Sequence, residues 1–160
     1  MAAKCAKDHF MNLLCVLWLM PKEENITICM WTDINELCDL IRETSFSIHK
    51  YLRYGHLEKI YENSLANRLR KKGLDIKQQH PIKVHDEDGT LLGDFYADIL
   101  AENQLIVEIK ACKSLAAEHT AQLLGYLRAT DMEHGLLINF GAPKLQIRKY
   151  ILSETKEKYS

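Results

Sequence analysis

The chain has 160 residues, of which 47% are hydrophobic and 27% are charged. This length and balance exclude a disordered or fibrous protein and leave room for one domain with a sizeable core. With 21 Lys and Arg against 22 Asp and Glu, the formal net charge is -1. A strongly basic protein that attracts polyanions through its overall field is excluded, so a nucleic acid would have to be held by a local patch.

The N-terminal residues 1–31 are predicted to form an extension outside the core. Residues 10–20 (FMNLLCVLWLM) are apolar but too few to span a bilayer as a helix, so we expect no membrane segment. A signal peptide is the alternative, although no small-x-small cleavage site follows. The cysteines lack the spacing of a zinc knuckle or a disulfide framework and suit reduced thiols in a cytoplasmic protein: Cys5, Cys15, Cys29, Cys38 and Cys112.

Two amphipathic helices are predicted next. The first covers residues 33–52, with an apolar stripe of Ile34, Leu37, Leu40, Ile41, Phe46 and Ile48. The second covers residues 54–73, with a stripe of Leu57, Ile60, Tyr61, Ser64, Leu65 and Leu69 and a stop at Gly73. The basic cluster before Gly73 is typical of a helix C-terminus, and a phosphate-binding role could coexist with it: Arg68, Arg70, Lys71 and Lys72.

Three consecutive antiparallel strands are predicted after these helices. Residues 75–85 form a strand that Pro81 predicts at a sheet edge or with a bulge, and residues 86–89 (DEDG) form a turn. A hairpin follows, with arms at residues 93–101 and 105–111.

The remaining elements complete one domain. A helix is expected at residues 116–130, with Ser114 as its N-cap and an apolar face of Ala117, Ala121, Leu124 and Leu127. Two further strands at 135–140 and 144–152 precede a polar tail at 153–160. We therefore expect a core domain at residues 32–152 with a mixed sheet flanked by helices, an α/β or α+β fold.

Charged residues inside the hairpin need a separate explanation. Side chains alternate between the faces of a strand, so the odd-numbered residues are assigned to the core face: Phe95, Ala97, Ile99, Leu105, Val107 and Ile109. A three-residue tip at 102–104 then sets Asp98 opposite Glu108, with Lys110 on the same face. Facing carboxylates are destabilising, so either Lys110 or a divalent cation should compensate them. The alternative is a solvated face with ordinary surface ion pairs.

A family resemblance follows from these residues. The pattern D-x9-E-x-K on a hairpin, between two helices, resembles the PD-(D/E)XK nuclease superfamily. The chain is most similar to the GxxExxY group of that superfamily, whose naming motif matches Gly55, Glu58 and Tyr61 in GHLEKIY. The segments YENSLANRLRKKGL, YADIL, IVEIKA, AQLLGYLRAT and GLLINFG are also similar, so the resemblance runs from Asp33 to Ile151. Ala97 stands where the superfamily's naming proline would be.

The resemblance implies a restriction-endonuclease-like core with its active site at the hairpin. Its implied catalytic residues are Glu58, Asp98, Glu108 and Lys110. Its implied metal ligands are Asp98, Glu108 and the main-chain carbonyl of Ile109, and its implied substrate-binding residues are Gln122 and Tyr126. We therefore expect a magnesium-dependent nuclease acting on DNA or RNA, with Mn²⁺ as a second candidate ion. The alternative is a catalytically silent module that binds nucleic acid or a protein partner.

Simpler roles stay open for several of these side chains. Glu58 could pair with a neighbouring lysine, and Tyr61 could pack in the core. Gln122 and Tyr126, which share a helix face, could serve as cap or packing residues. Asp94 is a competing carboxylate four residues before Asp98. His119 shares a helix face with Gln122, and no pair of the seven histidines has metal-binding spacing.

Overall fold

The computed structural model describes residues 33–152, so the predicted extension at 1–31 and the tail at 153–160 lie outside the described residues. The elements in chain order are α2 (Ile34–Leu52), α3 (Glu58–Arg70), β1 (Ile76–His85), β2 (Leu91–Ala101), β3 (Leu105–Lys110), α4 (Ala117–Thr130), β4 (His134–Asn139) and β5 (Gln146–Ile151). The predicted order of helices and strands is confirmed. Over this range no helix combines the length and the apolar character that crossing a membrane requires.

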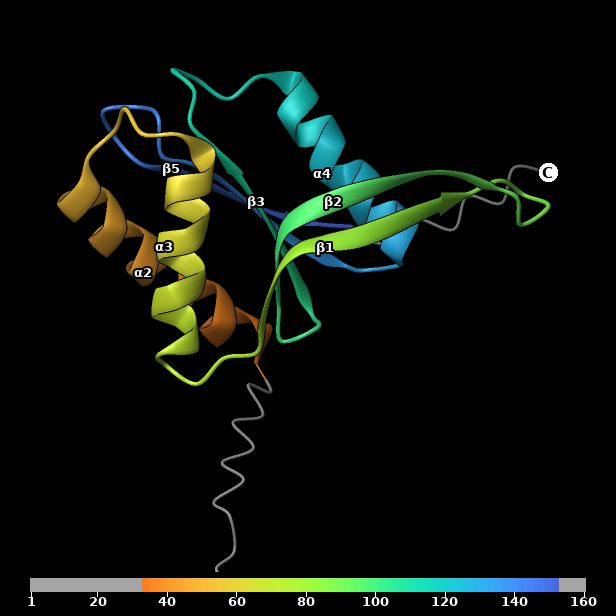
Figure 1. Ribbon diagram of the computed structural model, residues 1–160, viewed down its shortest axis with the longest axis horizontal. Helices are drawn as coiled ribbons and strands as arrows, with labels where there is room; N and C mark the ends of the chain where they lie inside the picture. Colours follow the sequence, from red (N-terminus) through yellow and green to blue (C-terminus); the bar gives the residue numbers. More distant parts are fainter. Residues whose placement is uncertain (1–32, 153–160) are drawn as a thin grey trace, which may run out of the picture. The chain divides into compact units, whose positions relative to one another are not determined.

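The five strands form one mixed sheet in the order β1-β2-β3-β4-β5. Only β3 and β4 pair in parallel, and the other neighbours are antiparallel. Helices α2 and α3 cover one face of the sheet, and α4 covers the other (Figure 1). Strand β1 lies at an edge of the sheet, as its proline predicts.

Both faces of the central strand β3 are buried. Leu105, Val107 and Ile109 belong to the core under α2 and α3, which confirms the predicted face. Ile106 belongs to a second core under α4, together with Leu100 of β2. The sequence-based assumption of a single core face was therefore wrong, because a crossover helix covers the other face of a parallel strand pair.

Helix α2 is stabilised at its start and along its buried face. The Asp33 carboxylate accepts a hydrogen bond from the backbone N–H of Asn35 at 2.8 Å, which caps the first turn. Thr44 and Ser45 are polar but can be buried, because their hydroxyls donate to carbonyls one turn earlier. Phe46, predicted on the apolar face, is 54% exposed, because it follows Ser45 and lies off the stripe that contacts the sheet.

Helix α3 buries a narrower stripe than predicted. Tyr61, Leu65 and Leu69, four residues apart, are fully buried against the sheet. Leu57 and Ile60 are exposed. Leu57 precedes the first helical residue as its N-cap, and Ile60 flanks the stripe, so neither meets the sheet.

Helix α4 also presents a different face from the predicted one. Leu123, Tyr126 and Leu127 are buried, whereas Ala117 and Ala121 are exposed. The larger apolar side chains take the sheet-facing positions because they bury more surface than alanine.

The N-terminus of α4 corrects a second prediction about this helix. Its N-cap is Ala116 rather than Ser114. The ring Nδ1 of His119 accepts the backbone N–H of Ala116 at 3.2 Å. His119 therefore satisfies one of the first backbone donors of the helix.

The β1–β2 hairpin changes faces halfway along its length. Ladder pairing runs through Gln78 opposite Ile99 and resumes at His80 opposite Ala97, skipping Gln79 and Asp98. Gln79 has a positive φ of 50°, which interrupts the alternation of side chains. We call this point the switch.

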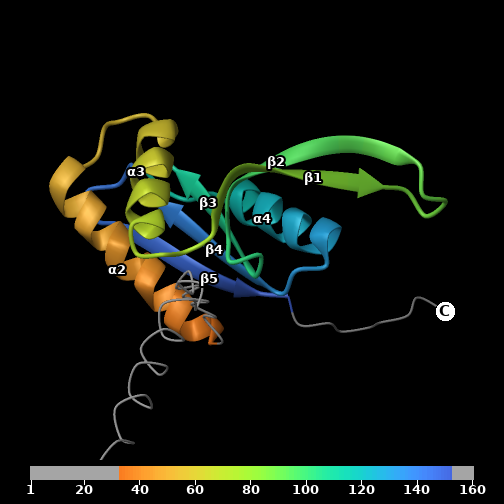
Figure 2. The same cartoon turned by 60° about the horizontal axis from the view of Figure 1, so that its bottom comes forward.

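The two halves of the hairpin pack in different cores because of the switch. Before it, Ile76 and Ile99 belong to the core under α2 and α3. Beyond it, Ile82 and Ala97 belong to the core under α4. Phe95, predicted in the first core, is therefore 51% exposed. Residues 80–97, which we call the arm, extend along α4 and past its end (Figure 2).

Candidate active site

The hairpin residues singled out by the sequence lie where β2 separates from β3. The strands pair through Ala101 opposite Leu105 and Ile99 opposite Val107, joined by a tip at 102–104. This register is the predicted one, and it sets Asp98 level with Glu108. The β2–β3 ladder ends at Ile99, and an Asp98 carboxylate oxygen instead accepts the backbone N–H of Ile109 at 2.8 Å.

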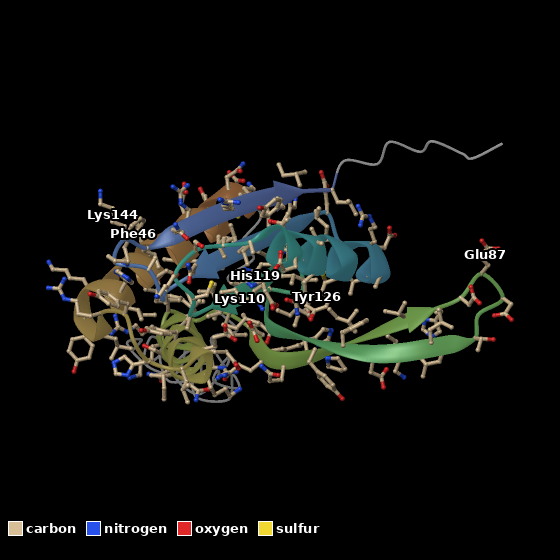
Figure 3. The ribbon with its side chains drawn as sticks, turned by 90° about the horizontal axis from the view of Figure 1, so that it is seen from above. Phe46, Glu87, Lys110, His119, Tyr126 and Lys144 are labelled. Carbon is tan, nitrogen blue, oxygen red and sulfur yellow. The ribbon has the colours of Figure 1, made fainter. Side chains whose placement is uncertain are left out.

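A chain of polar contacts links the end of β3 to α4. The Lys110 ammonium donates to Oε1 of Glu108 at 2.7 Å and to Oε1 of Gln122 at 3.0 Å. The Gln122 amide donates to the Tyr126 hydroxyl at 2.7 Å. Figure 3 shows Lys110 and Tyr126 between α4 and the β1–β2 hairpin, with Glu87 far away at the tip of the arm. The structure thus brings both predicted substrate-binding residues to the predicted lysine.

Glu108 is a buried carboxylate with only one of its oxygens satisfied. Its side chain is 3% exposed. Oε2 is buried without a hydrogen-bond partner among residues 33–152. Burial and the negative charge of Asp98 raise the pKa of Glu108 from 4.5 to about 7, against the opposing effect of Lys110. A solvated surface pair is therefore the wrong description of this face of the strand.

The neighbouring groups show the same excess of negative charge. Burial raises the pKa of Asp98, although the hydrogen bond from Ile109 opposes this effect. Burial lowers the pKa of Lys110, but the hydrogen bond and charge of Glu108 outweigh it, so the pKa of Lys110 is raised. One ammonium therefore faces at least two carboxylates in a partly desolvated site.

Helix α3 brings two further carboxylates to this region. Glu58, predicted from the resemblance, accepts the backbone N–H of Ala111 at 3.1 Å and thus bonds the segment that follows β3. It does not pair with Lys59, whose ammonium bonds Glu62 instead. Glu62 lies one helical turn after Glu58, on the same side of the helix.

Glu62 is a residue that the sequence analysis missed. It is 2% exposed and accepts hydrogen bonds from Lys59 at 2.7 Å, Gln78 at 2.8 Å and Gln79 at 2.9 Å. No local signal in the sequence could have revealed it, because its partners Gln78 and Gln79 come from β1.

Gln79 is the second residue missed, and it connects Glu62 with Asp98. Its amide donates to Glu62 and lies 3.4 Å from Oδ1 of Asp98. Its positive φ turns the side chain out of the regular alternation. A hollow of about 500 Å³ opens beside these groups and is also lined by Glu58. Asp94, the competing carboxylate, is exposed on the arm beyond the switch, opposite Lys83.

The motif GHLEKIY builds the entry to α3. Gly55 has a φ of 110°, which favours glycine. The Tyr61 hydroxyl donates to the carbonyl of Arg53 at 2.8 Å and accepts the N–H of His56 at 3.2 Å. Its ring stacks on Phe140 with centroids 4.6 Å apart. Tyr61 therefore fixes the loop before Glu58 from within the core.

The predicted basic cluster lies at the other end of α3. Arg68 donates to Ser47, and Arg70 donates to the carbonyl of Ile76 and to Gln78, so both bind within the fold. Glu58 and Arg70 are twelve residues apart, or ~18 Å along the helix axis. The cluster is thus remote from the Glu58 end, and a local nucleic-acid patch there stays a prediction.

The donor set fits a hard divalent cation. Among residues 33–152, no group of three or more His, Cys, Asp and Glu could hold a metal. Magnesium, however, needs only one or two carboxylates and completes its shell with water and substrate oxygens. The unpartnered Oε2 of Glu108 and the nearby Asp98 supply such a pair. The predicted carbonyl of Ile109 follows Glu108 directly.

Among three comparisons with known proteins, the family model is the one that identifies a family. A family model described as PD-(D/E)XK nuclease superfamily matches residues 35–150. A search of curated proteins gave no match. A similar solved structure is the crystal structure of SSO0001, with a TM-score of 0.49 and 17% identity, covering 73% of this chain and 59% of that chain. The chain thus spans less than two thirds of that structure's length.

Proposed function

The chain belongs to the PD-(D/E)XK nuclease superfamily, and on this premise we propose that it is a metal-dependent nuclease of the GxxExxY group. The observation that carries the proposal is the buried, unpartnered Glu108 oxygen beside Asp98 and Lys110. Buried side-chain oxygens with only a structural role normally have a hydrogen-bond partner, so an oxygen without one points to a missing ligand. The reaction is hydrolysis of a phosphodiester bond in DNA or RNA.

Asp98, Glu108 and the carbonyl of Ile109 are the residues that would hold the cation. Mg²⁺ is the ion we favour, and Mn²⁺ has the same ligand preference for oxygen. When bound, the ion would polarise a phosphate oxygen and lower the pKa of a bound water. The N–H of Ile109 donates to Oδ2 of Asp98, whereas Oδ1 has the longer contact with Gln79. Oδ1 is therefore the oxygen that is more available to bind the ion.

Lys110 is suited to binding negative charge on the substrate. An ammonium has three donors, and two of them go to Glu108 and Gln122. Within residues 33–152 the third donor has no partner, so it could orient a water or stabilise charge that develops on the scissile phosphate. Glu58 acts on the site through the backbone of Ala111 and is a positioning residue in this proposal.

A cleavage assay with isosteric variants tests the proposal. Asp98→Asn, Glu108→Gln and Lys110→Met are each expected to lower metal-dependent cleavage by about 100-fold or more. Asp94→Asn makes the same chemical change on an exposed part of β2 and serves as the control. The assay uses single-stranded and duplex DNA and RNA with Mg²⁺ or Mn²⁺, and circular dichroism checks folding.

Calorimetry separates the nuclease from the silent binding module. The nuclease proposal expects wild-type protein to bind Mg²⁺ or Mn²⁺ and Glu108→Gln to bind it more weakly. A folded wild type that binds nucleic acid but neither ion, and cuts none of the substrates, would favour the binding module instead.

A further inference from the structure

A second hollow lies between α4 and the arm. It is an open cleft of about 600 Å³ with mostly apolar walls, within the usual range of ~300–1,000 Å³ for small-ligand sites. Val84 and Phe95 line it from the arm, and Gly125 and Tyr126 line it from α4. We call it the arm cleft.

The arm cleft adjoins the candidate active site through shared side chains. Gln122 and Tyr126 line the cleft and also continue the polar chain from Glu108 and Lys110. A substrate phosphate at Lys110 would thus have its neighbouring nucleoside at the mouth of the cleft.

The walls of the cleft are suited to a flat aromatic ring. The rings of Phe95 and Tyr126 have centroids 5.8 Å apart and are tilted by 42°, so they do not stack on each other. Phe95 is half exposed, so its ring has a free face. The Gln122 amide has a second N–H besides the one that it donates to Tyr126, and this donor lies at one side of the cleft, where the edge of a base would need a partner.

Charge also favours this mode of binding over a grip on a duplex backbone. The chain has a formal net charge of -1. Among the described residues that line the cleft, one is a cation, Arg128, and one is a carboxylate, Glu118. Neutralising many phosphates needs a basic groove. Stacking on aromatic side chains instead needs unpaired bases whose faces are accessible.

We propose that the arm cleft binds one unpaired nucleobase next to the scissile phosphate, so that the substrate is single-stranded nucleic acid. The proposal rests on the proposed function, because it takes the phosphodiester to lie at Lys110. Bases in a duplex are paired and stacked, and the cleft admits them only after unpairing.

Gly125 offers a direct way to fill the cleft. Apart from its chain neighbours and the nearby backbone of its own helix, a Cβ at this position would meet no described atom within 4 Å. Gly125 lies in α4, where leucine is a better helix former. Gly125→Leu therefore fills the cleft with little strain. Asn67→Leu is the control, because it also adds a leucine to an exposed helical position, and Asn67 in α3 does not line the cleft.

The experiment compares cleavage of a single-stranded oligonucleotide with hydrolysis of bis(p-nitrophenyl) phosphate, a small phosphodiester without a base. We expect Gly125→Leu and Phe95→Ala each to lower the ratio of the two kcat/KM values about tenfold or more. Asn67→Leu should leave the ratio as in wild type. Wild-type protein should cut the single strand at least tenfold faster than the same sequence in a duplex.

Binding in EDTA makes this inference separable from the proposed function. Fluorescence anisotropy should show weaker binding of the single strand to Gly125→Leu than to wild type. If neither substrate is cut but this weakening is seen, the nuclease proposal fails and the assignment of the cleft stands. Equal binding and equal ratios in wild type and Gly125→Leu would overturn the assignment. So would self-association of wild type that Gly125→Leu abolishes without changing oligonucleotide binding, because the cleft would then bind a second copy.

Discussion

Replacing Glu108 by Gln tests whether the buried carboxylate of the site destabilises the folded protein when it is ionised. The carboxyl is buried beside Asp98, and its pKa is raised from 4.5 to about 7 in the folded protein. Glutamine keeps an oxygen for Lys110 and cannot ionise. The variant therefore removes the ionisation of this group while keeping the shape of the side chain.

The raised pKa fixes the sign and the size of the pH dependence. A group with a higher pKa in the folded state stabilises the fold fully below its unfolded pKa, and this contribution is lost as the pH rises through the folded pKa. A difference of about 2.5 pKa units corresponds to about 3 kcal/mol. As the pH rises from about 4.5 to somewhat above 7, the free energy of unfolding of Glu108→Gln should thus increase by about 3 kcal/mol relative to that of wild type.

Urea unfolding at pH 5 and pH 8 in EDTA measures this gain. A constant offset between the two proteins is expected as well, because the glutamine amide places a donor where Oε2 lacks a partner. The prediction concerns only the part of the difference in free energy of unfolding that changes with pH. Asp94→Asn controls for the loss of one negative charge from an exposed part of the hairpin. Parallel stability curves for wild type and Glu108→Gln would refute the assignment of a destabilising buried carboxylate.

Four further substitutions test the framework around the site and the helix α4. Glu62→Gln should lower the free energy of unfolding by about 1–3 kcal/mol, because the amide puts a donor where a buried oxygen accepts from Gln78 and Gln79. Urea unfolding measures this change, and an unchanged value would contradict the hydrogen bonds assigned to Glu62. Tyr61→Phe should cost about 1 kcal/mol in the same assay, since its hydroxyl bonds two backbone groups of the loop before α3. Gly141→Ala should cost about 1–3 kcal/mol, because its Cβ would lie 2.3 Å from the backbone of Ala111; Gly125→Ala, which meets open space within a helix, should instead stabilise the protein by about 0.5–1 kcal/mol.

The hairpin was predictable because its geometry is local. Alternation along the strands and a three-residue tip were enough to set Asp98 level with Glu108, and the observed pairing has that register. Spacing on one helix likewise placed Gln122 and Tyr126 together, and their side chains are hydrogen-bonded. In these cases the sequence distance determines which side chains meet.

The missed residues depend on contacts between distant segments. Nothing local distinguishes the buried Glu62 from an exposed helix glutamate, because its partners Gln78 and Gln79 come from β1. The positive φ of Gln79 and the resulting switch of faces were equally hidden, and they made the prediction for Phe95 wrong. Alternation identifies the face of a strand only while the strand stays regular.

The switch at Gln79 and Asp98 divides one hairpin into two parts with separate tasks. The part near the tip at 102–104 is fixed in the core and positions Asp98 against β3. The arm beyond it lines the cleft through Val84 and Phe95. Residues 83–95, which exclude the buried Ile82, can therefore be substituted without moving the carboxylates. Under the proposed function, substitutions in the arm would change substrate preference and leave the chemistry of the carboxylates unchanged.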